Sequence, residues 1–294
     1  MKIAVAKYPI DAPLRFDDFA DKQTRWLHEA SSAGADIAVL PEYLSLELGA
    51  TFVPQIRGDL HASLAAIQPY RKAWIDLYAG LARDCGLRIV AGTFLLDVGK
   101  GLYRNRADLF SPDGGHVWQD KLQLTGFEKK TGVLEAGDAL KVFEFDGLRA
   151  GIAICYDIEF PLPVRAQCEA GGQLLLVPSC TDTAAGATRV RVGCLARALE
   201  NRCFVAKAVT AGEAPWSPLL DINTGDATVY APMDVGLPAD GIVAATSAAW
   251  GWAYADFDAQ RLRDSRAHAQ VANDRDWSGQ WAPTLQQAKV EICA

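Results

Sequence analysis

Short apolar runs alternate along this chain with longer segments whose apolar residues recur at helical spacing. The run Lys2–Tyr8, which is rich in β-branched and small residues, predicts a strand. An amphipathic segment that begins near Asp17 predicts a helix that ends at Gly34. A second apolar run, Asp36–Leu40, predicts a short buried strand that Pro41 terminates.

The alternation continues through most of the chain. Further helices are predicted over Tyr70–Cys85, Pro163–Ala170 and Thr188–Asn201. Further strands are predicted over Leu87–Thr93, Asn105–Phe110, His116–Lys121, Phe143–Phe145, Leu148–Cys155, Leu174–Pro178, Cys203–Val209, Gly241–Ala249 and Ala253–Phe257. The dipeptide Asp146-Gly147 predicts a tight hairpin between two of these strands. Together the elements predict an α/β layered fold in which part of the sheet is antiparallel or mixed.

The chain is expected to fold as one domain over residues 1–258. No Pro-, Ser- or Gly-rich linker and no run of charge divides this part of the sequence. The polar tail, residues 259–294, is expected to pack on this domain or on a partner subunit.

Charge and cysteine content narrow the classes of function. The 294 residues carry a net charge of -7, and the densest basic stretch, Arg189 to Arg202, is diluted by Glu200. This balance argues against nucleic-acid binding. The chain shows no leader segment and no apolar run of the roughly 18 residues that a membrane span needs, so no membrane association is expected. Seven scattered cysteines favour reduced thiols and a cytoplasmic protein.

Reactive side chains stand at three places where an apolar run stops. Glu42 follows one predicted strand, Lys121 ends another, and Cys155 ends a third before a turn into a helix. A partly desolvated carboxylate can serve as a general base, an ammonium can hold a developing negative charge, and a thiol can act as a nucleophile. Each alone has an ordinary alternative: a capping glutamate, a solvated lysine and a buried structural cysteine.

The three residues in this order resemble the Glu-Lys-Cys triad of the nitrilase superfamily of carbon–nitrogen hydrolases. The resemblance rests on the segments Leu-Pro-Glu (40–42), Lys-Leu-Gln-Leu-Thr-Gly-Phe-Glu (121–128), Ile-Cys-Tyr-Asp (154–157), Leu-Leu-Val-Pro-Ser (175–179) and Arg-Ala-Leu-Glu-Asn (197–201). It covers roughly residues 2–258. The chain departs from the usual pattern at Ile158-Glu159, Leu162 and Cys180-Thr181-Asp182-Thr183. These positions lie near the pocket in the family, so the natural substrate stays open.

The resemblance implies a fold, a mechanism and a set of site residues. The family fold is a four-layer α-β-β-α sandwich with two mixed sheets, and its members usually pair through a helical face into homodimers or larger homo-oligomers. Glu128 matches a second glutamate that assists the triad. The family needs no metal and no organic cofactor, and His28, His61, His116 and His268 show no metal-ligand spacing. The implied activity is amidase-like cleavage of a small amide or carbamoyl compound through a cysteine thioester.

Five residues beside the motifs are candidates for binding the substrate: Tyr43, Tyr156, Thr181, Arg189 and Trp216. Arg189 can hold a substrate carboxylate, and Arg191 is the alternative, because the rotation of a helix turns only one of them inward. Nitrile hydrolysis and acyl transfer by the same triad remain open, as does a non-catalytic binding module. A thiol peptidase is disfavoured, because such enzymes use a histidine base and no histidine lies beside these motifs.

Overall fold

The strands and helices follow the predicted alternation. A computed structural model describes residues 1–247, 249–269 and 271–292, so residue 248 of a predicted strand and residues 270 and 293–294 of the tail lie outside the described residues. The strands are β1 (Lys2–Pro9), β2 (Ile37–Val39), β3 (Arg88–Gly99), β4 (Leu102–Phe110), β5 (His116–Asp120), β6 (Val142–Phe145), β7 (Leu148–Ile152), β8 (Leu174–Ser179), β9 (Phe204–Glu213), β10 (Ile222–Asn223), β11 (Thr228–Tyr230), β12 (Ile242–Ala245) and β13 (Gly251–Asp256). The α-helices are α1 (Phe16–Ser32), α2 (Pro54–Arg57), α3 (Leu60–Ile67), α4 (Arg71–Cys85), α5 (Gly126–Thr131), α6 (Pro161–Glu169), α7 (Ala184–Asn201), α8 (Ala259–His268) and α9 (Asn273–Asp276).

Short 3-10 helices complete the secondary structure: η1 (Leu44–Thr51), η2 (Gln68–Tyr70), η3 (Cys155–Glu159), η4 (Trp277–Trp281) and η5 (Pro283–Leu285). The first of these and α3 were not predicted. Both lie between the second and third strands, where the sequence shows no sustained helical spacing of apolar residues. Among the described residues, no helix is long and apolar enough to span a bilayer.

The predicted α/β fold with a mixed sheet is confirmed. Its central path runs β5-β4-β3-β2-β1-β9-β8-β7-β6, with parallel pairs in the middle and antiparallel pairs at both ends. The two sheets that the family resemblance implies are joined here into one hydrogen-bonded path. The junction is a short parallel pairing of the end of β1 with β9, Lys7 with Val209 through Pro9 with Ala211. The four-layer description stays a prediction.

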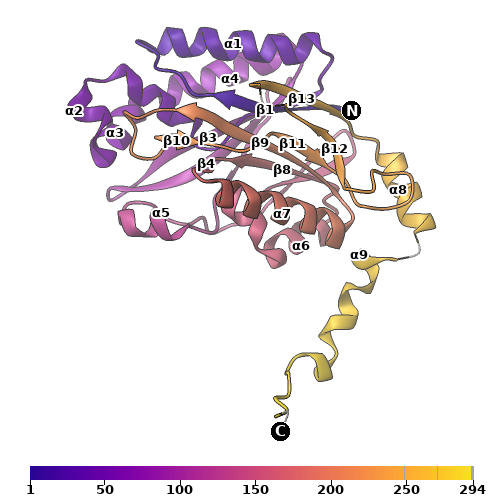
Figure 1. The fold of residues 1–294 in the computed structure, drawn as a ribbon. Helices are drawn as coiled ribbons and strands as arrows, with labels where there is room; N and C mark the ends of the chain where they lie inside the picture. The colour runs from indigo at the N-terminus through magenta and orange to yellow at the C-terminus, as the bar shows by residue number, and fades with distance from the viewer. Residues whose placement is uncertain (248, 270, 293–294) are drawn as a thin grey trace.

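Helices cover both faces of the strands. α1 and α4 lie on one side, and α6 and α7 lie on the opposite side (Figure 1). Buried apolar residues form two core clusters, one with each pair of helices. One contains Phe19 of α1 and Trp74 of α4, and the other contains Cys194 and Ala198 of α7. Burying such faces on both sides of the sheet is the main stabilising contribution to an α/β domain.

Local residue chemistry explains the sharpest boundaries. α4 ends at Gly86, whose φ of 65° is the left-handed conformation that glycine adopts at helix ends. The β6–β7 hairpin turns at Asp146 and Gly147, with φ of 50° and 72°, as a two-residue turn of the primed type requires.

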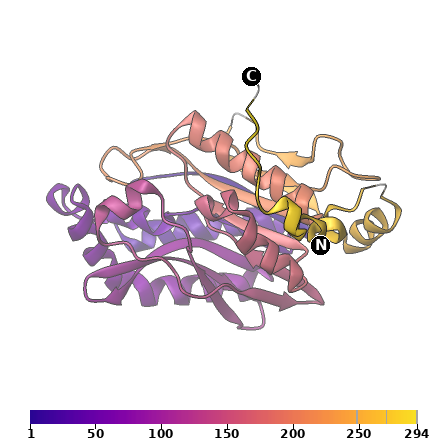
Figure 2. The same ribbon diagram turned by 90° about the horizontal axis from the view of Figure 1, so that it is seen from below.

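The C-terminal tail starts on the domain and then leaves it. In α8, the Arg266 guanidinium donates to the Arg202 carbonyl at 2.7 Å. Beyond α9 the chain runs away from the body (Figures 1 and 2). The domain boundary at residue 258 and a contact of the tail with a partner subunit stay predictions.

A glycine in β3 lets the chain after β2 pack closely. The β3–β4 register shifts between Val90 and Thr93, and Gly92 in this irregularity has a φ of 64°. A Cβ at residue 92 would lie 2.3 Å from the Pro41 carbonyl oxygen. The next residue, Thr93, accepts a hydrogen bond from the Tyr43 amide at 2.7 Å. The bulge therefore supports the segment that carries Glu42.

We expect Gly92→Ala to destabilise the fold more than Gly86→Ala does. Gly86 has nearly the same φ, 65°, but nothing lies within 4 Å of its Cβ position. The control should lose about 1–2 kcal/mol, the cost of a left-handed alanine. The Gly92 variant should lose about 1–3 kcal/mol more through overpacking. Urea unfolding measures both, and equal losses would contradict the close approach to Pro41.

Candidate active site

The predicted reactive residues converge at one edge of the sheet. Glu42 lies just after β2, Lys121 directly follows β5, and Cys155 opens η3 after β7. Glu128 lies in the short helix α5. Parallel strands end at a common edge, where loops leave a crevice. The fold thus brings together Glu42, Cys155 and the neighbouring pair Lys121 and Glu128 from three separate parts of the chain.

The centre of the site is an ammonium between two carboxylates. Lys121 Nζ lies 2.8 Å from Glu42 Oε1 and 2.8 Å and 2.9 Å from the two oxygens of Glu128. The three residues are 2%, 1% and 1% exposed, respectively. Both carboxylates therefore contact the ammonium directly.

Helix α5 fixes Glu128 from its own first turn. Thr125 caps the helix, and its amide donates to Glu128 Oε2 at 2.7 Å while the Glu128 amide donates to the Thr125 hydroxyl at 3.1 Å. This reciprocal capping box holds the carboxylate in place. The Tyr43 hydroxyl donates a further hydrogen bond to Glu128.

The two glutamates have opposite pKa shifts. Burial raises the pKa of Glu42, although Lys121 pulls it down, and the neighbouring charge of Glu128 raises it further. Burial also acts on Glu128, but Lys121, Tyr43 and the Thr125 amide bring its pKa below the ordinary value. The pKa of Lys121 is raised well above its ordinary value, because the two carboxylates outweigh its burial. Glu42 is therefore the carboxylate better suited to accept a proton.

The Cys155 thiol stands beside this group on a turn with a left-handed backbone. Its φ is 49°, an unusual conformation for a residue with a side chain. Two acceptors lie beside its single proton, the Cys180 carbonyl at 3.4 Å and the Glu42 carboxylate. The Ser179 hydroxyl donates to the sulfur at 3.4 Å. Burial and the Glu42 charge raise the pKa of the Cys155 thiol, so the resting sulfur holds its proton.

The backbone of residue 180 contacts both the Glu42 carboxylate and the Cys155 thiol. Its amide donates to Glu42 Oε2 at 3.1 Å, and its carbonyl accepts from the thiol. Residue 180 follows β8 directly. The end of that strand therefore aligns the carboxylate and the sulfur.

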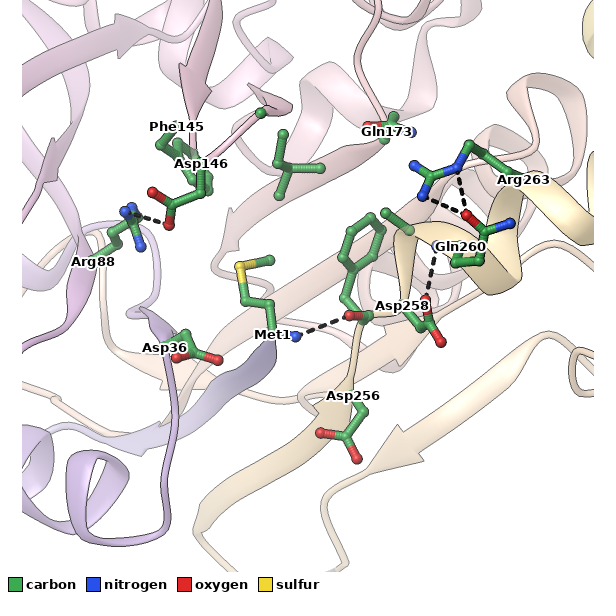
Figure 3. A pocket seen from close by; sticks show the side chains of 14 residues that line it. Met1, Asp36, Arg88, Phe145, Asp146, Gln173, Asp256, Asp258, Gln260 and Arg263 are labelled. Atoms are coloured by element: carbon green, nitrogen blue, oxygen red, sulfur yellow. Dashed lines mark hydrogen bonds and ion pairs between the residues drawn. The ribbon is translucent and has the colours of Figure 1, made fainter.

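A cavity of about 350 Å³ opens onto these groups, large enough for a small molecule. Glu42, Lys121 and Cys155 form its floor, and Arg189 lines its wall. An adjoining cavity of about 360 Å³ shares Cys155 and Arg189. A larger cavity of about 820 Å³ lies near Met1 instead (Figure 3). Its wall comes from strand ends and from α8 and includes none of Glu42, Lys121, Glu128 and Cys155, so we place no chemistry there.

Four of the five predicted substrate-binding residues line these two cavities. Tyr43 lines the first, Tyr156 and Thr181 line the second, and Arg189 lines both. Trp216 lines neither cavity. Its ring packs against the core cluster that contains Phe19 and Trp74 instead, and a Cβ on Gly49 would lie 3.4 Å from it.

The neighbours of Trp216 take the place expected for it. Pro218 and Leu219, from the same loop, line the first cavity. Closeness to a motif in sequence did not reveal which residue of this loop faces inward. Arg191, the alternative to Arg189, lines a different cavity.

Several supporting residues were missed by the sequence analysis. The Asn105 amide donates to Glu42 Oε1 at 2.8 Å, and the Thr210 hydroxyl donates to the Glu42 carbonyl at 2.8 Å. The Asp157 carboxylate accepts from the amides of Gln123 and Ile154, at 2.7 Å and 3.0 Å. It thus ties the segment after Lys121 to the segment before Cys155. Only Asp157 had a sequence signal, its place in the Cys-Tyr-Asp motif.

No group of three or more His, Cys, Asp or Glu side chains that could hold a metal ion occurs within residues 1–247, 249–269 and 271–292. The arrangement of a thiol, two carboxylates and an ammonium can move protons and form a covalent bond with an electrophilic carbon.

The whole domain matches a known protein family. The family model for carbon–nitrogen hydrolases aligns with residues 2–267. This chain belongs to the carbon–nitrogen hydrolase family. The resemblance predicted from the motifs is confirmed.

Individual relatives agree with the family. The probable hydrolase YhcX of Bacillus subtilis is 31% identical over 94% of this chain, which spans about half of that protein, 53%. The omega-amidase NIT2 of Danio rerio is 25% identical over 93% of this chain and 94% of its own. An amidase of the nitrilase superfamily from Nesterenkonia sp. AN1, solved in complex with butyramide, superposes with a TM-score of 0.67 at 25% identity, covering 91% of this chain and 94% of its own. The carbon–nitrogen hydrolase family and these amidase relatives support a hydrolase.

The opposite pKa shifts of the two glutamates predict opposite effects on stability. A raised folded-state pKa contributes stability at low pH that is lost as the pH rises above the ordinary value of 4.5. A lowered pKa contributes stability at neutral pH that is lost as the pH falls below 4.5. With rising pH, Glu42→Gln should therefore gain stability relative to the wild type, and Glu128→Gln should lose it.

Urea unfolding of the wild type and both variants between pH 3.5 and 7.5 tests this pair of slopes. The comparison uses the change with pH, because each glutamine also loses hydrogen bonds that do not depend on pH. Slopes of the same sign for the two variants would contradict the assignment.

Proposed function

We propose that the protein hydrolyses the carbon–nitrogen bond of a small amide or carbamoyl compound, with Cys155 as the nucleophile. The observation that carries the proposal is the meeting of Cys155, Glu42 and Lys121 at the floor of one cavity. Membership of the family and the amidase relatives support the reaction class.

The first half of the reaction forms a thioester. Glu42 accepts the thiol proton while the sulfur attacks the carbonyl carbon, because the high pKa of the thiol makes a free thiolate costly. The carbonyl oxygen takes the negative charge, and Lys121 and the Tyr156 amide stabilise it. Losing one such donor costs about 10²–10³ in rate. Glu42 then returns the proton to the nitrogen, the carbon–nitrogen bond breaks, and ammonia or an amine leaves.

The second half releases the acid. Water attacks the thioester carbon while Glu42 accepts one of its protons, and the carbon–sulfur bond breaks. Glu42 passes this proton to the sulfur, so the neutral thiol and the ionised Glu42 carboxylate are both restored. Glu128 keeps Lys121 in place through both halves, since its two oxygens lie 2.8 Å and 2.9 Å from the ammonium nitrogen.

Nitrile hydrolysis and acyl transfer by the same residues remain alternatives, and a non-catalytic role would require a Cys155 thiol that does not react. A homodimer and a cytoplasmic location also stay predictions. We favour amide hydrolysis because the amidase from Nesterenkonia shares the fold over nearly the whole chain.

Cys155→Ala should abolish ammonia release from a panel of small amides, carbamoyl compounds and nitriles. The wild type mixed with an amide and quenched should carry an acyl group on Cys155, detected by peptide mass spectrometry. Cys85→Ala, at the end of α4 and away from the cavity, is the matched control and should keep its activity. Acylation of another residue, or turnover by Cys155→Ala, would remove the nucleophile from the proposal.

The substrate is proposed to carry a carboxylate remote from its amide. Arg189 lines the cavity, its side chain is 62% exposed, and its nearest carboxylate partner, Glu159, lies 3.7 Å away. Such an arginine is available for a forked contact with a substrate carboxylate. The similarity to an omega-amidase supports this class.

Arg189→Gln should raise KM for an amide with a terminal carboxylate about 10- to 100-fold, the loss of a charge-assisted hydrogen bond. KM for an uncharged amide of equal length should stay unchanged. Arg149→Gln removes one positive charge at a surface pair with Glu144 and serves as the control. An equal rise for both substrates would show that Arg189 shapes the cavity rather than recognising a carboxylate.

A further inference from the structure

A separate small cavity lies against another face of α7. Ala187, Thr188 and Arg191 line this cavity, whereas Gly186, Arg189 and Val190 of the same helix face Cys155. At 100° per residue these two sets point to nearly opposite sides of the helix. The cavity has a volume of about 210 Å³, and strands β9, β11 and β12 complete its wall.

One residue of this wall is a buried lysine. Lys207 of β9 is 3% exposed and lines the cavity. Within the described part of the chain its ammonium makes no hydrogen bond and no ion pair. Burying a cation without a partner is costly, and ordinary proteins pair such groups.

A second unpartnered donor stands nearby on the next strand. Tyr230 of β11 is 1% exposed, and its hydroxyl has no hydrogen-bond partner among the described residues. Thr228 lies opposite Lys207 in the β9–β11 pair, and Tyr230 lies two residues further along the same strand face. Lys207 and Tyr230 therefore line the same cavity.

The charge around the cavity is positive. Arg191 adds a guanidinium to the Lys207 ammonium, and the carboxylate of Asp226 is already 2.8 Å from Lys7. Burial lowers the pKa of Lys207 and outweighs the opposite effects of Cys194, Asp226 and Cys155, and Arg191 adds a small lowering effect. A bound anion would favour the charged form of Lys207 and so oppose this lowering.

We propose that this cavity binds a small oxyanion, a carboxylate or a phosphate, through Lys207 and Tyr230, with Arg191 supplying further positive charge. Two donors on neighbouring strands suit a ligand with several oxygens. The volume exceeds the roughly 30 Å³ of one water molecule. The site is distinct from the cavity at Cys155 and belongs to none of the proposed catalytic steps.

Thermal unfolding in acetate, phosphate and chloride at equal ionic strength and pH tests the site. The melting temperature of the wild type should rise with the logarithm of the concentration of acetate, phosphate or both, as ligand binding to the folded state requires. In chloride, Lys207→Met should melt higher than the wild type, because it removes the unpartnered cation. With acetate or phosphate, the melting temperature of Lys207→Met should show only the gradual rise that excluded salts cause in proteins generally. Tyr230→Phe should bind about tenfold more weakly.

The outcomes separate cleanly. A logarithmic rise with acetate alone or with phosphate alone identifies which oxyanion the site binds. An equal response of the wild type and Lys207→Met, or an equal effect of chloride, would overturn the proposal.

Amine labelling of the wild type keeps the test independent of how Lys207→Met folds. Fluorodinitrobenzene should label Lys207 about tenfold more slowly at an anion concentration ten times Kd, because about a tenth of the sites stay free. Lys72, whose side chain is 85% exposed, is the internal control and should react at an unchanged rate. Labelling of Lys207 that neither anion slows would also overturn the proposal.

Discussion

The burial of one ammonium between two carboxylates is the constraint on which the site depends. Lys121 can remain charged in the interior only because Glu42 and Glu128 surround it. Such a buried group contributes little net stability, but it specifies one arrangement, because removing any member leaves an uncompensated charge. The end of β2 is thereby held in one geometry with the end of β5 and the helix α5, which lie about eighty residues later in the chain.

The two carboxylates of this group differ in their affinity for a proton. Glu128 is secured by its own helix turn and by Tyr43, so it stays ionised. Glu42 is held by single contacts to Lys121, Asn105 and the residue-180 amide and has the higher proton affinity. Two glutamates on one lysine thus acquire different chemistry from their environments, which is how a fold sets an acid and a base apart.

Much of this arrangement followed from the sequence, for physical reasons. Glu42, Lys121 and Cys155 were recognised because each ends an apolar run, and α1, α4 and the β6–β7 hairpin because their apolar spacing and glycines are local signals.

The pairing of β1 with β9 was not predictable. About two hundred residues separate the two strands, and the sequence of neither strand indicates which strand it pairs with. Asn105 and Thr210 are single polar residues within strands, and only the assembled sheet turns them toward Glu42. Trp216 was misplaced because nearness to a motif does not define the direction of a side chain in a loop.

The two backbone contacts of residue 180 bear on how the active site can move. This residue touches the carboxylate through its amide and the sulfur through its carbonyl, so a displacement of the end of β8 carries both contacts with it. The path of the proton between them would then keep its length while the surrounding walls adjust to molecules of different shape. Tolerance in the choice of substrate and accuracy in proton transfer can coexist in this fold because the backbone of one residue contacts both groups that exchange the proton.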